Sequence, residues 1–215
     1  MSFGLQEKLI AIPPQMPRIR GQRFVRWVGS LVIRCSNWRV VGEFPDVPRL
    51  VAIAAPHSSN WDGIIGISAA YAMGVRATWM GKDSLFKHGL AGLMRGLGGI
   101  PTDRSNPRGA VGQMAEMLKT TREPLWLFLA PEGTRKKVRK WRTGFWHIAS
   151  EAGVPILLVA IDFPARRFVV GPLFHPGGDK EADLARLYDY YRQFVGKDGK
   201  SPLPLDVLEA EAGPG

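Results

Sequence analysis

The sequence predicts an α/β fold in which a layered mixed sheet is flanked by helices. Two continuous apolar runs, residues 125–130 and 156–161, have the length of strands buried on both faces of a sheet. Segments with helical spacing alternate with strand-like runs along the chain, which is the order of a layered α/β sheet. The 215 residues, 45% of them hydrophobic, support one good core without an obvious linker. We therefore expect one main domain, over residues 38–200.

An amphipathic, membrane-associating segment is expected before this domain, over residues 1–37. Helical spacing places Arg23, Arg26 and Arg34 on one stripe, with a wide apolar face opposite. A basic amphipathic helix of this type is typical of one that lies in the plane of an acidic bilayer surface. The alternative is an ordinary helix packed on the domain, with its arginines in solvent.

The first half of the domain is predicted to contain three strands and a buried helix. Residues 38–44 and 50–55 have the composition of strands, and Pro56 ends the second run. Residues 64–73 are uncharged and long enough for a buried helix, and residues 75–80 alternate as a strand. The connection at Pro56 therefore joins a strand to a helix, and such connections carry the chemistry of α/β folds.

The second half is predicted to repeat this alternation. We expect helices at 84–97, 107–120 and 180–195, each from its apolar spacing, and a turn at 98–104. The two buried strands described above fall between the second and third helices, followed by a short edge strand at 167–170. The last fifteen residues, 201–215, contain three prolines and are expected to form a loose tail.

The strand-to-helix connection holds His57 and, five residues later, Asp62. Residues five apart on one helix point about 140° away from each other, so these side chains meet only if His57 precedes the helix. Ser58, Ser59 and Asn60 are good N-caps, and a helix that begins near Asn60 folds Asp62 back towards the imidazole. The carboxylate would then accept one ring N–H and leave the other nitrogen as a base for an alcohol proton. The alternative is a capping box, in which Asp62 only satisfies a backbone amide.

Charge and composition predict an anionic partner. The net charge of +10 and pI near 10.1 indicate nucleic acid, acidic lipid or a phosphorylated substrate. Seven tryptophans favour a membrane–water interface, and no nucleic-acid-binding signature is present, so we expect an acidic membrane surface and no nucleic acid. Without a secretory signal or a run of about 20 apolar residues, we expect a peripheral protein on the cytoplasmic face. The single cysteine, Cys35, suits a reducing compartment and lacks metal-site neighbours.

Four short blocks occur in order, at residues 57–62, 98–104, 131–135 and 154–156. They read His-Ser-Ser-Asn-Trp-Asp, Gly-Gly-Ile-Pro-Thr-Asp-Arg, Pro-Glu-Gly-Thr-Arg and Val-Pro-Ile. This pattern resembles the four-block signature of the glycerolipid acyltransferases, the 1-acylglycerol-3-phosphate O-acyltransferase family and its lysophospholipid relatives. The Glu-Gly-Thr-Arg block is the most specific of the four. Many relatives have Asn before the histidine, where this chain has Pro56.

The resemblance implies transfer of a fatty acyl group from acyl-CoA or acyl-carrier protein to the free hydroxyl of a lysophospholipid. The acceptors it implies are lysophosphatidate, glycerophosphate or another lyso-acceptor such as lysophosphatidylcholine. It assigns His57 as general base and Asp62 as its orienting partner. It also implies that the acceptor's phosphate or glycerol portion is held by residues of the second and third blocks and, by a looser match, a lysine before them: Arg104, Glu132, Gly133, Thr134, Arg135 and Lys82.

The residue chemistry agrees with this reaction. Attack on a thioester needs no metal or other cofactor, because the thiolate is a good leaving group, and the four histidines show no metal-site spacing. Donors to the developing oxyanion are expected among the backbone amides at the helix start after His57. A non-catalytic basic lipid-binding protein would also explain the charge and the tryptophans. A serine hydrolase is disfavoured, because no Gly-x-Ser-x-Gly elbow occurs.

Overall fold

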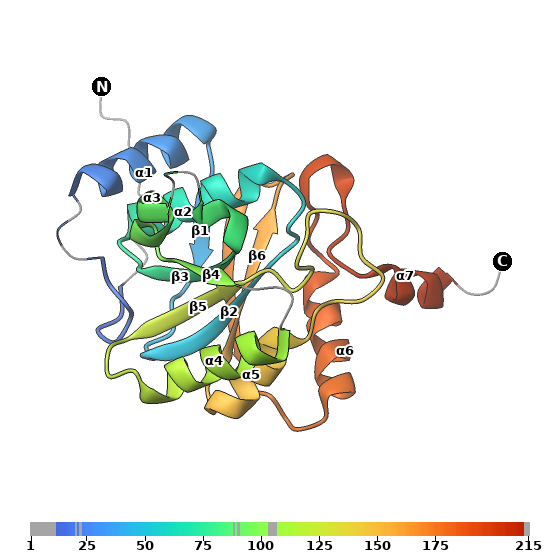
Figure 1. Cartoon of the computed structure of the whole chain (residues 1–215). Coiled ribbons are helices and arrows are strands. Elements are labelled where there is room, and N and C mark those ends of the chain that lie inside the picture. The colour runs from blue at the N-terminus through green and yellow to red at the C-terminus, as the bar shows by residue number, and fades with distance from the viewer. Residues whose placement is uncertain are drawn as a thin grey trace.

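One mixed sheet of seven strands organises the molecule within the described residues (Figure 1). The computed structural model describes residues 12–19, 21, 23–87, 89, 91–102 and 107–212. The strands are β1 (Arg39–Gly42), β2 (Arg49–Ala55), β3 (Ala77–Lys82), β4 (Gly99–Thr102), β5 (Leu125–Leu129), β6 (Ile156–Asp162) and β7 (Arg167–Phe174). Their order across the sheet is β1-β7-β6-β2-β5-β3-β4. The predicted layered mixed sheet is therefore confirmed.

The sheet is parallel from β6 to β4, and its single antiparallel pair joins β6 to β7. The carboxyl ends of β6, β2, β5, β3 and β4 consequently lie along one edge of the sheet. Chain segments that follow these strands meet at that edge, although they are far apart in the sequence.

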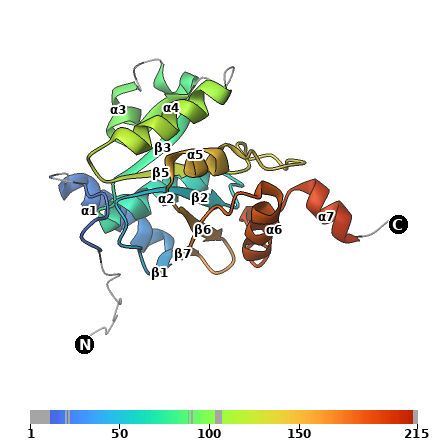
Figure 2. The same ribbon diagram turned by 90° about the horizontal axis from the view of Figure 1, so that it is seen from below.

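Helices cover both faces of the sheet. On one face lie α4 (Pro107–Thr120), α5 (Gly144–Ala152) and α6 (Lys180–Tyr191), and on the other lies α2 (Asn60–Met73) with α1 (Arg23–Ser36) along it. Figure 1 shows α1 and α2 on the opposite side of the sheet from α4 and α5, and Figure 2 looks onto the α4–α5 side. The shorter elements are a 3-10 turn at Asp83–Phe86, α3 (Ala91–Gly96), a 3-10 turn at Lys197–Gly199 and α7 (Leu205–Ala212).

The central strand β2 shows why the sheet is buried on both sides. Val51, Ile53 and Ala55 face the core formed with α4, α5 and α6, whereas Leu50 and Ala52 face the core on the α2 side. All five are fully buried. Side chains alternate between the faces of a strand, so a strand covered on both faces must be apolar throughout. This is the physical reason why the apolar runs were readable as interior strands.

The amino-terminal helix α1 packs on α2. Gly29 lies so close to α2 that an added Cβ would come within 2.6 Å of the Ser68 carbonyl oxygen. One side of α1 is therefore in contact with the domain, and the membrane-associating role expected for residues 1–37 stays a prediction. Among the described residues, no helix combines the length and apolar character needed to cross a membrane.

Two predictions for the segments around β3 and the outermost strand β4 were wrong. The continuous helix expected at 84–97 is interrupted, because Gly89 adopts the left-handed φ of 81° between the 3-10 turn and α3. The turn expected at 98–104 contains strand β4, which pairs with β3 at the sheet edge, where a proline such as Pro101 is tolerated. Gly98 permits this pairing, since a Cβ there would meet the Ala77 carbonyl oxygen at 2.0 Å.

Three further differences concern the second half of the chain. The expected short edge strand at 167–170 is β7, which is eight residues long and lies inside the sheet between β1 and β6. Helix α5 was not predicted, although Phe145, Trp146 and Ile148 bury its apolar side. The loose tail expected at 201–215 is wrong for its described part, because Leu203 is buried and α7 follows it. Both views place α7 beyond α6 (Figures 1 and 2).

Candidate active site

The predicted catalytic pair lies at the carboxyl edge of the sheet. His57 follows β2, and Asp62 occupies the first turn of α2, which begins at Asn60 as expected. Nδ1 of His57 lies 3.4 Å from Oδ2 of Asp62. The Asp62 side chain is fully buried, whereas the His57 side chain keeps 23% of its surface exposed. The two groups therefore face each other, with the imidazole accessible to a substrate.

Asp62 makes both contacts that the sequence left open, one with the start of α2 and one with His57. Its Oδ2 accepts hydrogen bonds from the backbone amides of Ser58 (2.5 Å) and Ser59 (2.7 Å), and its Oδ1 accepts one from the Ser59 hydroxyl (2.8 Å). These contacts complete a capping box at the start of α2. The same carboxylate faces His57, so the capping contacts also fix the position of the group that lies beside the imidazole. The Ser58 and Ser59 amides are occupied in this way and are not free to donate to an oxyanion. For the amides from Asn60 onward, at the start of α2, the expectation stays a prediction.

The third sequence block forms the turn that supports the His57 loop. Oε2 of Glu132 accepts a hydrogen bond of 2.7 Å from the backbone amide of His57. Gly133 adopts a left-handed φ of 64°, and a Cβ there would lie 2.5 Å from the Arg142 side chain. The Thr134 hydroxyl accepts the backbone N–H of Lys136 at 3.3 Å. The Glu-Gly-Thr triplet therefore builds the turn and holds the loop, while the next residue, Arg135, carries the exposed charge.

A cationic hollow adjoins His57. Its walls come from the His57 loop, from the turn after β5 and from a segment near the carboxyl terminus, and its cations are Arg135, Lys136, Lys137 and Lys200. Burial lowers the pKa of His57 below its usual value, the Asp62 carboxylate opposes this, and the Arg135 guanidinium lowers it further. The imidazole is thus kept neutral at pH 7, which is the form that accepts a proton.

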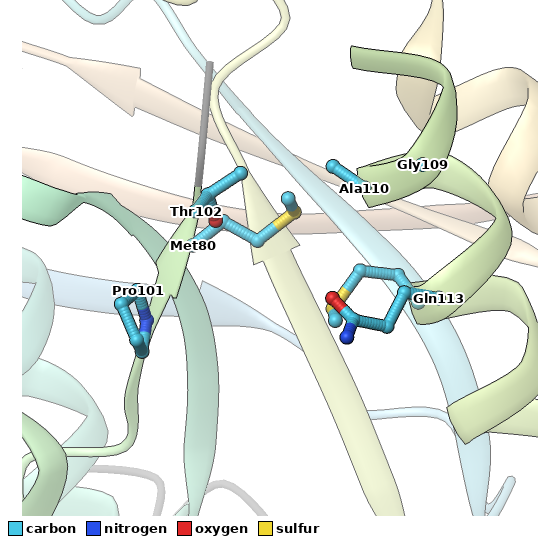
Figure 3. A pocket seen from close by; sticks show the side chains of 7 residues that line it. Met80, Pro101, Thr102, Gly109, Ala110 and Gln113 are labelled. Carbon is cyan, nitrogen blue, oxygen red and sulfur yellow. The ribbon is translucent and has the colours of Figure 1, made fainter. Parts of the chain in front are cut away.

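A second hollow of about 260 Å³ lies at the β3 and β4 end of the same edge. It is lined by Met80, Pro101, Thr102, Gly109, Ala110, Gln113 and Met114. Figure 3 shows Met80 and Thr102 on one side and Ala110 and Gln113, from α4, on the other. Its walls combine apolar side chains such as Met80 and Met114 with the polar Thr102 and Gln113, and they lack the cations that line the hollow beside His57.

Two predicted phosphate-binding residues cannot be assigned a contact. Lys82 ends β3 at the carboxyl edge of the sheet, but the described part of that residue is its backbone. Arg104 lies outside the described residues, two positions after the end of β4 at Thr102. The structure therefore brings together His57, Asp62, Glu132 and Arg135, and the topology places the strands that precede Lys82 and Arg104 at the same edge.

Comparison with known proteins decides the family. The family model described as "Acyltransferase" matches residues 41–162, a range that contains β2, α2, the His57–Asp62 pair and the Glu132–Arg135 turn. The chain belongs to the acyltransferase family. The resemblance inferred from the four blocks is confirmed.

Individual relatives agree with this family assignment. A 1-acyl-sn-glycerol-3-phosphate acyltransferase from Haemophilus influenzae is 33% identical over 145 residues, covering 62% of this chain and 58% of the relative. The Escherichia coli protein of the same name is 34% identical over 50% of this chain and 44% of its own length. A probable 1-acyl-sn-glycerol-3-phosphate acyltransferase from Mycoplasma pneumoniae is 30% identical over 91% of this chain and 74% of its own length. The chain thus spans about half the length of the first two relatives.

The fold also has a counterpart among solved structures. The crystal structure of the 1-acyl-sn-glycerophosphate acyltransferase from Thermotoga maritima matches with a TM-score of 0.53 and 18% identity. The match covers 78% of this chain and 75% of that one. The mixed sheet with helices on both faces is therefore an acyltransferase fold.

Sequence reasoning missed the contribution of the carboxyl-terminal part of the chain to the candidate site. Lys200, Ser201, Pro202 and Leu203 line the cationic hollow, although they lie outside the range of the family model. Their composition resembles that of a loose tail, with one proline and one serine. The only sequence signal was the apolar Leu203, which is buried.

Glu132→Gln is expected to change the pH dependence of stability. Burial raises the pKa of Glu132 from 4.5 to about 7. Between these values the unfolded chain has released the proton that the folded protein retains, so the free energy of unfolding falls as pH rises through this range. At about 1.4 kcal/mol per pKa unit, the loss is about 3 kcal/mol. Glutamine keeps an oxygen for the His57 amide without this loss.

Chemical denaturation at pH 4 and at pH 8 measures the effect. The stability of the variant relative to the wild type should rise by about 3 kcal/mol between the two pH values. Glu151→Gln, at an exposed position on α5, is the matched control. If the free energies of unfolding of Glu132→Gln and wild type differ by the same amount at both pH values, the result would contradict the burial of an ionisable carboxylate beside His57.

Proposed function

We propose that this protein transfers a fatty acyl group from a thioester donor to the free hydroxyl of 1-acyl-sn-glycerol 3-phosphate (lysophosphatidate). One observation carries this proposal: a partly exposed imidazole, oriented by a buried carboxylate, lies beside a hollow lined by Arg135 and three lysines. Such a site combines a base for an alcohol with cations for a phosphate. The names of the relatives support the same acceptor.

His57 acts as general base in the proposed mechanism. Oδ2 of Asp62 lies 3.4 Å from Nδ1 of His57. In the proposed reaction it accepts the Nδ1–H, so that Nε2 is free to take the proton of the acceptor hydroxyl. The hydroxyl oxygen attacks the thioester carbonyl carbon, a tetrahedral oxyanion forms, and the carbon–sulfur bond breaks as the carbonyl is restored. The proton on Nε2 is passed to the departing thiolate, which restores neutral His57. No metal or redox cofactor enters this balance.

Arg135 binds the acceptor phosphate in this proposal. Its guanidinium lines the same hollow as His57, and its planar donors match two phosphate oxygens at once. Arg104 and Lys82 are proposed to add donors from the β4 and β3 side of the same edge. Acyl-CoA and acyl-carrier protein both fit as donors, because each presents the acyl group as a thioester.

We also propose that α1 and the start of α2 attach the protein to an acidic membrane surface, as a peripheral protein on the cytoplasmic face. Three apolar side chains of α1 are exposed: Phe24 (74%), Trp27 (60%) and Leu31 (45%). Arg23, Arg26 and Arg34 are exposed next to them, because the side of α1 that carries Gly29 is the one that packs on α2. On α2, Trp61 and Ile64 are also exposed. An apolar stripe flanked by arginines is the pattern of a helix at an anionic lipid surface.

Replacing Phe24 and Trp27 together by serine should weaken vesicle binding by up to about 1000-fold. Each large apolar side chain contributes about 2 kcal/mol when fully buried, and ten-fold in affinity corresponds to about 1.4 kcal/mol. Cosedimentation with vesicles that contain anionic lipid measures the effect. The matched control exchanges the two residues, Phe24→Trp with Trp27→Phe, and conserves the apolar surface. If the serine variant cosediments with vesicles as much as wild type does, the exposed face of α1 is not the attachment site.

An acceptor panel tests the proposed reaction. The protein is supplied with acyl-CoA and, separately, with lysophosphatidate, glycerol 3-phosphate, lysophosphatidylcholine or a lyso-aminolipid. We expect lysophosphatidate to be consumed at the highest kcat/KM. Consumption of a zwitterionic acceptor in its place would overturn the acceptor assignment. The absence of transfer to every acceptor and from both donor types, with vesicle binding intact, would support the competing function of a non-catalytic lipid-binding protein.

A further inference from the structure

Residues 196–206 form a strap that joins the two loops of the active site. At one end, the Trp141 indole donates to the Pro202 carbonyl at 3.0 Å, and the Lys137 ammonium donates to the Ser201 carbonyl at 3.0 Å. The Leu205 amide continues this contact by donating to the Val138 carbonyl at 2.9 Å. The strap is therefore bound along the loop that carries Arg135.

The other end of the strap binds Ser58, the residue directly after His57. The Lys197 amide donates to the Ser58 hydroxyl at 2.9 Å, and the Lys200 ammonium donates to the Ser58 carbonyl oxygen at 3.2 Å. The packing is close, because a Cβ on Gly196 would lie 2.8 Å from the Ser58 hydroxyl oxygen. Ser58 itself is buried. These contacts place the charge of Lys200 one residue from the catalytic base.

The ammonium of Lys200 has capacity for a further ligand. An ammonium carries three donors, and one of them is used by the Ser58 carbonyl. Lys200 is exposed and lines the same hollow as His57 and Arg135. Its remaining donors are thus available to an anion that enters this hollow.

We infer that Lys200 is a specificity-determining residue that selects acceptors with a phosphate monoester. This inference rests on the proposed function. In lysophosphatidate the phosphate is carried by the carbon next to the one that bears the reacting hydroxyl, so a base that reaches the hydroxyl has the phosphate close by. In acyl-CoA the nearest phosphate lies beyond the whole pantetheine arm. A cation one residue from His57 therefore fits the acceptor's phosphate rather than the donor's phosphates.

The position of Lys200 beside the hollow depends on the strap. Lys200 lies outside the residues matched by the family model, and the hydrogen bonds to Ser58 and Trp141 hold it at the hollow. A charged hydrogen bond to phosphate is stronger than a neutral one, and phosphate monoesters carry close to two charges at neutral pH. Phosphodiester acceptors, which carry one charge, gain less from Lys200, and acceptors without a phosphate gain nothing.

The test compares Lys200→Gln with Lys200→Arg and with the control Lys119→Gln. Glutamine keeps a neutral N–H donor for the Ser58 carbonyl and removes only the charge, whereas arginine keeps the charge. Lys119 is an exposed lysine at the end of α4, near Arg49 at the opposite end of β2. For each variant, kcat and KM are measured with lysophosphatidate and with 1-monoacylglycerol, which lacks the phosphate, and KM is measured for acyl-CoA.

Lys200→Gln should raise the KM for lysophosphatidate by about 10-fold or more, in line with the loss of a hydrogen bond to a charged group. We expect kcat to stay within a few-fold of wild type, 1-monoacylglycerol to be unaffected, and Lys200→Arg and Lys119→Gln to resemble wild type. An unchanged KM for lysophosphatidate overturns the inference. So does a loss confined to kcat, which would indicate that Lys200 only positions Ser58, or a rise confined to the KM for acyl-CoA.

Direct binding separates this inference from the proposed function. Calorimetric titration with a short-chain lysophosphatidate is carried out on wild type and on Lys200→Gln. If wild type transfers no acyl group but binds this probe 10-fold more tightly than the variant, the subsite stands and the proposed reaction fails. If wild type transfers the acyl group and both proteins bind the probe equally, the reaction stands and the inference about Lys200 fails.

Discussion

His57→Ala should lower kcat for acyl transfer by 10²- to 10⁴-fold, the usual contribution of a positioned general base. The substitution removes the group that takes the hydroxyl proton, while Asp62 keeps its hydrogen bonds to Ser58 and Ser59. The start of α2 therefore stays capped, and we expect the variant to remain folded and bound to vesicles. The loss of kcat is measured in an assay of acyl transfer from acyl-CoA to lysophosphatidate, in which the release of free CoA thiol is monitored.

The matched control is His147→Ala. His147 is exposed on α5 and belongs to neither loop of the active site. We expect this control to keep wild-type kcat and KM. If His57→Ala is as active as His147→Ala, then the assignment of His57 as the base is wrong and the site works by another group.

Asp62→Ala should reduce both activity and stability. The carboxylate is fully buried and accepts two backbone amides and one hydroxyl. Its removal leaves buried donors without a partner, which costs about 1–3 kcal/mol for each group, so we expect a loss of about 3 kcal/mol in the free energy of unfolding. The imidazolium formed during the reaction also loses its counter-charge, and we expect kcat to fall by about 100-fold.

Two variants separate these roles of Asp62. Asp62→Asn keeps the size and one acceptor oxygen, so stability should recover in part, while kcat stays low because the amide carries no negative charge. Asp179→Ala removes the N-cap contact of α6 to Ala182 and should cost about 1 kcal/mol with full activity. If the Asp62 variants lose stability but retain wild-type kcat, Asp62 acts as a helix cap only.

Local chemistry explains why the catalytic corner was predictable from the sequence. A proline after an apolar strand, three N-capping residues and an acid in the first helical turn leave few ways to connect β2 to α2. His57 and Asp62 are only five residues apart, so the geometry of their contact depends on that local turn. The same reasoning holds for the strands that are buried on both faces, since their apolar runs follow from burial alone.

Elements that depend on distant partners were not predictable in the same way. Strand β4 exists because β3 is available for pairing, and its own sequence, with Gly99 and Pro101, favours a turn. Strand β7 lies inside the sheet because β1, from the start of the domain, pairs with its outer side. In each case the partner strand supplies the hydrogen bonds that the local sequence does not specify.

The class of fold, the contact between His57 and Asp62 and the family could be inferred from the sequence, because each of these is encoded in short segments with local physical preferences. Three contacts depend on the packing of distant segments: Glu132 holds the His57 amide, α1 packs on α2 with Phe24 and Trp27 outward, and Lys200 reaches Ser58. These contacts join residues up to 142 positions apart. They form when the chain folds and brings distant segments together, and no local sequence pattern predicts these contacts.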